Sequence, residues 1–375
     1  MSWSKKINLF FLFLLTGLFS LGQLQRVELF TWPAFYVHDV IIFIWITFNL
    51  PIKKIKKCYF DNEERESVFK FFRNYKLEII LFAWIILGLI VNLLFASLNW
   101  QLIFYVFRFS AYSLLFFLIY RQKLISKKII KFAFLYAGLM ILFLGLLQYI
   151  FLPDMRFLKI LSWDDHYYRL ISTQFDPNYA GSILVITYVN LLNSQFKKLK
   201  LTLFFFLILG LALTFSRASY LVFVIINLIL FFKHKFNYKF MLAVLLLIFF
   251  IWLIPKPGGE GVNLSRISSL NARVLNERAV AADLDSWQLI LGKGLFNIPQ
   301  LKSHAVLPNN ILLLIVNYLG LGGLVLSSLL LFKHLPFCYR KNFIFFLIFL
   351  AVLIHSQFNN SFFQPFVFLL MLGGI

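Results

Sequence analysis

Charged residues are scarce in this sequence and apolar residues are plentiful. Asp, Glu, Lys and Arg make up 14% of the 375 residues, apolar residues make up 61%, and the mean hydropathy is +0.84. A water-soluble chain of this length has a larger charged fraction and shorter apolar runs. Several runs here approach or exceed the roughly 20 residues that a helix needs to cross a bilayer. The composition therefore excludes a soluble protein and predicts an all-α, polytopic transmembrane helical bundle.

Cysteine is almost absent, and Cys58 and Cys338 are the only two. Both fall in segments that we predict to be cytoplasmic, where thiols stay reduced, so no disulfide is expected. Clusters of metal-ligating residues are equally scarce. Asp164-Asp165-His166 joins three such side chains, but no partner cluster occurs elsewhere. A solvated loop is a better interpretation of this segment than a metal site.

Acidic residues are also few, with 15 against 36 Lys and Arg, which gives a net charge of +21. The distribution of this charge argues against a nucleic-acid partner. The basic clusters lie between apolar runs and follow every second run, as the positive-inside rule predicts for cytoplasmic loops. The charge therefore indicates topology, with both termini in the cytoplasm. The clusters are Lys5-Lys6, Lys53–Lys57, Arg121–Lys131, Lys197–Lys200, Lys233–Lys239, and Lys333 with Arg340-Lys341.

Twelve apolar segments are predicted to span the membrane, in a single integral-membrane domain covering residues 1–375. The first segment follows two lysines and also resembles a signal peptide, but a retained helix is favoured because so many spans follow it. The last two spans are short. The predicted spans are Ile7–Leu24, Phe35–Leu50, Leu77–Ser97, Trp100–Tyr120, Ile129–Ile150, Asp176–Phe196, Leu199–Phe215, Ala218–Phe232, Phe240–Ile254, Ile311–Phe332, Phe343–Ile354 and Phe362–Ile375.

The polar segment Lys256–Leu307 separates the ninth and tenth spans and is predicted to be a long extracytoplasmic loop. We interpret it as half of an active site, and Ser216-Arg217, between two apolar runs on the same side, as the other half. A guanidinium group binds phosphate oxygens bidentately, through two parallel hydrogen bonds, and stays charged at any biological pH. Arginines that snorkel to lipid headgroups are the alternative. The segment carries Arg266, Arg273, Arg278, Lys293, Lys302 and His304, in addition to Lys256 at its start.

Arg108 lies inside the fourth predicted span. An arginine at that depth is costly and faces either a water-filled cavity or a partner in another helix. Both interpretations stay open from the sequence, and Arg108 is therefore a secondary candidate for substrate binding.

Four stretches between residues 165 and 335 resemble the O-antigen ligase and polymerase superfamily of integral-membrane glycosyltransferases. Each motif is short, and their order and shared side of the membrane carry the resemblance. The stretches are Arg169-Leu-Ile-Ser-Thr-Gln-Phe-Asp-Pro-Asn178, Leu213-Thr-Phe-Ser-Arg217, Arg273 followed by Leu291-Gly-Lys-Gly294, and Pro308-Asn309-Asn310-Ile311-Leu312 running into Leu319-Gly-Leu-Gly-Gly323.

The resemblance implies a metal-independent and cofactor-free transfer at the outer face of a bacterial cytoplasmic membrane. The donor would be an undecaprenyl-diphosphate-linked glycan, and the acceptor a hydroxyl of a lipid-anchored sugar or a growing glycan. Arg217 and Arg273 would bind the diphosphate and stabilise its developing charge. The resemblance also gives secondary places to Arg169, Asn178 and Asn310.

The sequence departs from the superfamily at the general base. The position that should be histidine is Asn309, and an amide does not accept a proton at neutral pH. His304 is the only histidine in the long loop, so it is the candidate base. Asp176 is the alternative if His304 does not serve.

Three functions remain open from the sequence. A ligase attaches a finished glycan to a lipid or surface acceptor. A polymerase extends the glycan block by block, and the spacing between Arg278 and Gly294 fits the Arg-x-Gly patterns described for polymerases. A transporter of lipid-linked glycan requires polar groups near the bilayer midplane, and apart from Arg108 the polar residues gather at the outer face.

Overall fold

The computed structural model describes residues 3–28, 34–50, 75–95, 102–161, 163–196, 198–297 and 308–374. Helices dominate these ranges, and the one strand pair within them is β1 (Arg26–Val27) with β2 (Phe35–Tyr36). The predicted all-α fold is therefore confirmed. The helices are α1 (Trp3–Ser20), α2 (Val37–Asn49), α5 (Lys76–Phe95), α6 (Leu102–Gln122), α7 (Lys127–Phe151), α8 (Pro177–Leu192), α9 (Lys200–Leu213), α10 (Arg217–Lys233), α11 (Tyr238–Leu253), α12 (Ser268–Ala282), α13 (Ser286–Leu291), α14 (Ile311–Lys341), α15 (Phe343–His355) and α16 (Pro365–Gly373).

Four of these helices are long and apolar enough to cross a membrane, namely α5, α6, α7 and α14. Four shorter helices, α2, α9, α11 and α15, are also apolar. These lengths and compositions support a membrane protein. The count of twelve spans remains a prediction, because several of the helices are shorter than a bilayer crossing requires.

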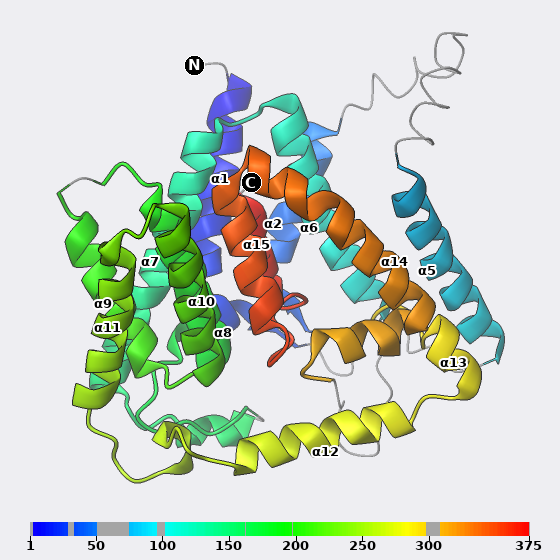
Figure 1. The fold of residues 1–375 in the computed structure, drawn as a ribbon. Coiled ribbons are helices and arrows are strands. Elements are labelled where there is room, and N and C mark those ends of the chain that lie inside the picture. Colours follow the sequence, from blue (N-terminus) through cyan, green and yellow to red (C-terminus); the bar gives the residue numbers. More distant parts are fainter. Residues whose placement is uncertain are drawn as a thin grey trace.

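Helix α8 lies at the centre of the bundle, where it packs against α7, α9, α10, α15 and α16 (Figure 1). Its residues from Ala180 to Leu191 are all buried. A helix that is apolar on all sides has no solvent-facing stripe and must be covered on every face. The burial of α8 fixes the position of its first turn, which begins at Pro177 after the capping residue Asp176.

The described part of the predicted long loop is largely helical. After the 3₁₀ turn Glu260–Val262, α12 runs across the end of the bundle and α13 follows at its far end (Figure 1). The sequence of α12 contains no glycine or proline and several strong helix formers, so it favours a helix once it lies against the bundle. From the sequence, no helices were predicted within this segment, and its extracytoplasmic location remains a prediction.

Helix α14 is broken at Gly320, whereas the sequence predicted one continuous span from Ile311 to Phe332. Gly320 has φ 67° and ψ −174°, and a Cβ there would lie 2.0 Å from the carbonyl oxygen of Ile290. The close approach of α13 thus requires glycine at this position. Beyond the break, α14 continues through Pro336 to Lys341.

The break in α14 leaves carbonyl groups without helical partners, and neighbouring elements supply the missing donors. The indole of Trp84 on α5 donates to the carbonyl of Leu319 at 2.8 Å. The backbone N–H of Lys293 donates to the carbonyl of Asn317 at 2.8 Å, and that of Gly294 to Tyr318 at 3.1 Å. Helices α5, α13 and α14 therefore form a unit held together by these bonds.

Candidate active site at the arginine end of the bundle

The turn between α9 and α10 is held by Arg169, which comes from the segment before α8. The guanidinium of Arg169 donates to the carbonyl of Thr214 at 3.0 Å and to that of Phe215 at 3.3 Å. Phe215 has φ 49°, a left-handed conformation that orients these carbonyls in an unusual direction. Burial, followed by repulsion from Arg266, lowers the pKa of Arg169 to about 10. Arg169 therefore positions the Ser216-Arg217 turn through its backbone.

Arg217 is the first residue of α10 and binds the segment that leads into α12. Its guanidinium donates to the carbonyl of Leu264 at 3.2 Å, to that of Arg266 at 3.0 Å and to the Ser269 hydroxyl at 2.9 Å. The two predicted halves of the site are therefore in direct contact. These bonds use three of the five N–H donors of a guanidinium, which leaves two for a ligand.

Arg273, one turn further along α12, lies near Arg217. Burial is the largest cause that lowers the pKa of Arg273, and repulsion from Arg217 is the next. Its guanidinium donates to the amide oxygen of Asn359 at 3.1 Å, in the link between α15 and α16. Two guanidinium groups that approach in this way form a site for a group with several negative charges.

Asp176 is an acidic residue whose charge acts on Arg273. Its Oδ1 accepts hydrogen bonds from the backbone N–H groups of Asn178 at 2.6 Å and Tyr179 at 3.2 Å, so it caps α8. Burial raises the pKa of Asp176, whereas those bonds and the charges of Arg169 and Arg273 oppose the shift. Within the described ranges, the other carboxylate oxygen of Asp176 accepts no hydrogen bond. Asp176 is thus a carboxylate with an available oxygen beside Arg169 and Arg273.

A continuous row of hydrogen-bonded side chains leads inward from this site. The Ser216 hydroxyl donates to the Asn178 amide oxygen at 2.9 Å and lies 2.9 Å from the Ser219 hydroxyl. The Ser219 hydroxyl is 3.0 Å from Nε2 of His355, and Nδ1 of His355 is 2.6 Å from the Ser361 hydroxyl. All except Asn178 are buried. This polar row connects α8 and α10 to the end of α15.

From the sequence, no role was assigned to His355. Its position at the end of an apolar run was the available signal, because a histidine within a span indicates a polar partner. His355 lies next to Arg273 through Asn359, whose backbone N–H donates to the His355 carbonyl at 3.1 Å.

The start of α14 contacts the end of α15 beside this polar row. Asn310 caps α14 by accepting from the N–H of Leu312 at 2.8 Å, and its amide donates to the carbonyl of Gln357 at 3.4 Å. Asn309 is half-buried, and its side chain forms no hydrogen bond within the described residues. His304 and Lys302 lie outside the described residues, so the role predicted for His304 remains a prediction.

Arg108 is bound to a partner in another helix. Its guanidinium forms an ion pair with Asp39 of α2 at 2.9 Å, and the Tyr112 hydroxyl donates to the same carboxylate. The guanidinium also donates to the carbonyl of Ala34 at 2.6 Å and lies 5.0 Å from the Tyr36 ring centre. These contacts match the interpretation in which Arg108 has a partner in another helix, and its secondary place among the substrate-binding candidates remains a prediction.

In the part of the chain that the structure describes, no group of three or more His, Cys, Asp or Glu side chains could hold a metal ion. His166 is instead a buried neutral side chain. Its pKa is lowered to about 4, mainly by burial and then by the charge of Arg169.

Comparison with family models, with curated proteins and with solved structures finds no match for this chain.

Proposed function

We propose that the chain is an O-antigen ligase-like glycosyltransferase. It works at the end of the bundle where Arg169, Arg217 and Arg273 lie, which we call the arginine end. It moves a glycan from an undecaprenyl-diphosphate carrier to a hydroxyl of a lipid-linked or cell-surface acceptor. The observation that supports this proposal is the approach of Arg217, at the start of α10, to Arg273 on α12, with Asp176 at the start of α8 beside Arg273. The resemblance of the same residues to the superfamily supplies the chemistry.

In the proposed reaction the acceptor oxygen attacks the anomeric carbon of the glycan and forms the new glycosidic bond. The bond between that carbon and the diphosphate oxygen breaks, and its electron pair leaves with the carrier diphosphate. Arg217 and Arg273 stabilise the charge that develops on the leaving diphosphate, since preorganised donors need no reorganisation during the reaction. The acceptor proton goes to a base.

His304 remains the base that the sequence predicts, and Asp176 is the alternative. Asp176 has an available carboxylate oxygen and a raised pKa, which are properties of a general base. His304→Ala should lower transfer by roughly two to four orders of magnitude, the usual contribution of a base. If His304→Ala transfers normally and Asp176→Asn does not, the base is Asp176. Asn309→His in the His304→Ala background should restore part of the activity, because it rebuilds the superfamily's histidine at the start of α14.

The arginine pair is tested in cells that lack the gene and carry it on a plasmid. Arg273→Ala should reduce transfer by a few hundred-fold, equivalent to about 3–4 kcal/mol in barrier height, and lipid-linked donor should accumulate. Arg217→Ala should behave similarly, and Arg→Lys should rescue only in part, since an ammonium lacks the planar fork. Arg278→Ala is the matched control, because Arg278 is exposed on the same helix. Equal loss at Arg278 would contradict a specific diphosphate site.

Glycan chain length, recorded in the same cells, separates the ligase from the polymerase. A ligase variant changes whether glycans are attached, whereas a polymerase variant changes the ladder of product lengths.

The twelve-span topology, with the arginine end outside a bacterial cytoplasmic membrane, belongs to the same proposal. Cysteine introduced at Ala272, which is exposed on α12, should react with an impermeant maleimide in intact cells. Cysteine at Lys123, exposed at the opposite end, should not. Native Cys58 and Cys338 are replaced by serine in both. The reverse labelling pattern would overturn the orientation.

A further inference from the structure

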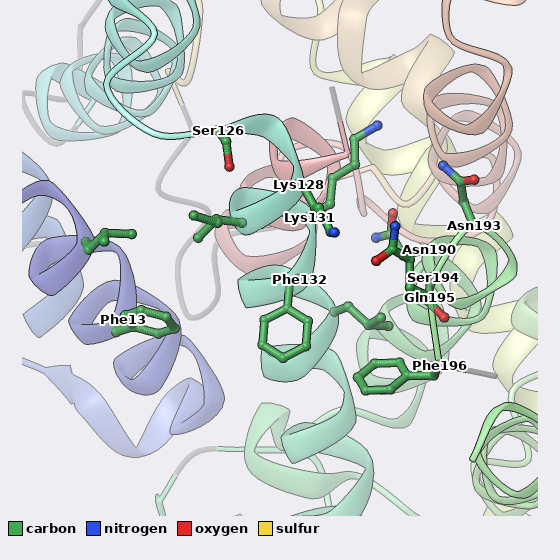
Figure 2. A pocket seen from close by; sticks show the side chains of 13 residues that line it. Phe13, Ser126, Lys128, Lys131, Phe132, Asn190, Asn193, Ser194, Gln195 and Phe196 are labelled. Atoms are coloured by element: carbon green, nitrogen blue, oxygen red, sulfur yellow. The ribbon is translucent and has the colours of Figure 1, made fainter. Parts of the chain in front are cut away.

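A cavity of about 1040 Å³ lies at the end of the bundle opposite the arginines. It is formed by α1, the first turns of α7, and the last turn of α8 with the link that follows (Figure 2). Helix α7 begins at this cavity and ends near the segment that contains Arg169. At about 1.5 Å per residue, its 25 residues separate the two sites by roughly 37 Å. The cavity is therefore distinct from the candidate active site.

The lining of the cavity has a polar side and an apolar side. In Figure 2 the two lysines and the amides of Asn190 and Asn193 gather on the right, and the Phe13 ring of α1 lies on the left. Among the described residues no acidic side chain lines the cavity. The lining residues are Leu9, Phe13, Ser126, Lys128, Ile129, Lys131, Phe132, Leu135, Asn190, Asn193, Ser194, Gln195 and Phe196.

Several polar groups that face the cavity have no partner within the described ranges. Asn190 is 8% exposed, and its side-chain amide makes no hydrogen bond there. The hydroxyl of Ser194 is buried and equally without a partner. Buried polar groups are normally hydrogen-bonded, so these two indicate a ligand with polar atoms.

Positive charge at the cavity is also uncompensated by the described residues. Lys128 and Lys131 form no ion pair among them. Ser126 precedes the first turn of α7, but its side chain caps none of the N–H groups there. The start of a helix attracts anions through these N–H groups and the helix dipole. The lysines and the helix start together favour a phosphate group.

We propose that this cavity binds an anionic phospholipid, with its phosphate between Lys128, Lys131 and Asn190. The apolar side distinguishes a lipid from free phosphate: Phe13, Phe132 and Leu9 provide a surface for an acyl chain, which inorganic phosphate does not use. The basic clusters predict that this end faces the cytoplasm, where anionic lipids attract lysines and arginines near the surface. The site does not depend on the proposed glycosyl transfer.

Native mass spectrometry of the full-length protein, purified in a neutral detergent, tests this site. Phosphatidylglycerol should remain bound and phosphatidylcholine should not. The double variant Lys128→Gln, Lys131→Gln should weaken phosphatidylglycerol binding by roughly tenfold or more, since each lysine contributes several-fold. Lys127→Gln is the matched control, because Lys127 neighbours the site but lies over the Tyr120 ring at 5.3 Å instead of lining the cavity. It should change binding by less than about twofold.

A second measurement uses the unsubstituted chain and so does not depend on how the variants fold. Reductive methylation of Lys131 should be slower in phosphatidylglycerol nanodiscs than in phosphatidylcholine nanodiscs, while methylation of Lys127 should differ less. Equal binding of the two lipids, equal loss in Lys127→Gln, or equal methylation of Lys131 in both nanodiscs would overturn the proposal. Inorganic phosphate that displaces the lipid at equal concentration would also overturn it, because the site would then recognise only a free anion.

Discussion

The two ends of the bundle carry positive charge in different ways. At one end, Arg169 and Arg217 donate to four backbone carbonyls and one serine hydroxyl. At the other end, Lys128 and Lys131 line a cavity without an ion-pair partner among the described residues. Arginine offers a rigid fork of donors, whereas the lysine ammonium is a point charge on a flexible stem. Hydrogen bonds within the protein therefore already hold the arginine side chains in place. The positions of the Lys128 and Lys131 side chains depend instead on the ligand that fills the cavity.

The largest expected effect concerns Arg108, whose buried guanidinium pairs with Asp39 and donates to the carbonyl of Ala34. Arg108→Ala leaves the buried Asp39 carboxylate without its counter-charge, which should lower the free energy of unfolding by about 3–5 kcal/mol. The shift in the thermal midpoint of unfolding, recorded on the purified protein in detergent, measures this loss of stability.

The control for Arg108 is a second arginine–aspartate pair. Arg156 binds Asp154 at 2.6 Å, but both side chains are largely exposed. Arg156→Ala should leave the midpoint unchanged, because exposed ion pairs contribute little. A similar shift in both variants would show that burial does not distinguish them.

A second effect concerns protonation of His166, whose pKa is lowered in part by Arg169. His166 has a pKa of about 4 in the folded protein and about 6.5 when unfolded. Between these values the unfolded chain binds more protons, so stability is present above pH 6.5 and falls as the pH drops toward 4. The loss should reach about 3 kcal/mol near pH 4.

His166→Gln removes this titration and tests it. Thermal midpoints at pH 7.5, 5.5 and 4.5 should fall more steeply for the natural chain than for the variant. At pH 7.5 neither form carries a charge at this position, so that measurement isolates the packing effect of the substitution. The same acid sensitivity in both proteins would show that another group is responsible.

Hydropathy was sufficient to locate most helices. The predicted span Ile129–Ile150 lies inside α7, and Phe343–Ile354 matches α15 within one residue. The break at Gly320 was not predictable, because it arises from contact with α13, about 30 residues away in sequence. Helix α12 was missed because its polar composition gives no apolar run of membrane length.

Part of the candidate site was also predictable from the sequence. Motif order brought Ser216-Arg217 and the segment before α12 to one side of the membrane, and the structure places them in contact. The partner of Arg108 and the row from Ser219 to His355 were not predictable, because 136 residues separate that serine from that histidine. Side-chain pairing between distant helices is a tertiary property that local patterns do not encode.

The smallest expected effect compares one serine from each end of the bundle. Ser216 caps α10 by accepting from the N–H of Ser219 and also donates to Asn178. Ser126 occupies the same position before α7, but its hydroxyl caps nothing. Ser216→Ala should therefore lower the free energy of unfolding by about 1 kcal/mol, the usual contribution of a helix cap, and Ser126→Ala by only a few tenths. Midpoints measured under identical detergent conditions separate the two, and Ser216→Thr, which keeps a hydroxyl, should recover most of the loss. If both alanine variants shift equally, then capping does not distinguish the two ends, and the rigidity of the arginine end must come from its guanidinium contacts alone.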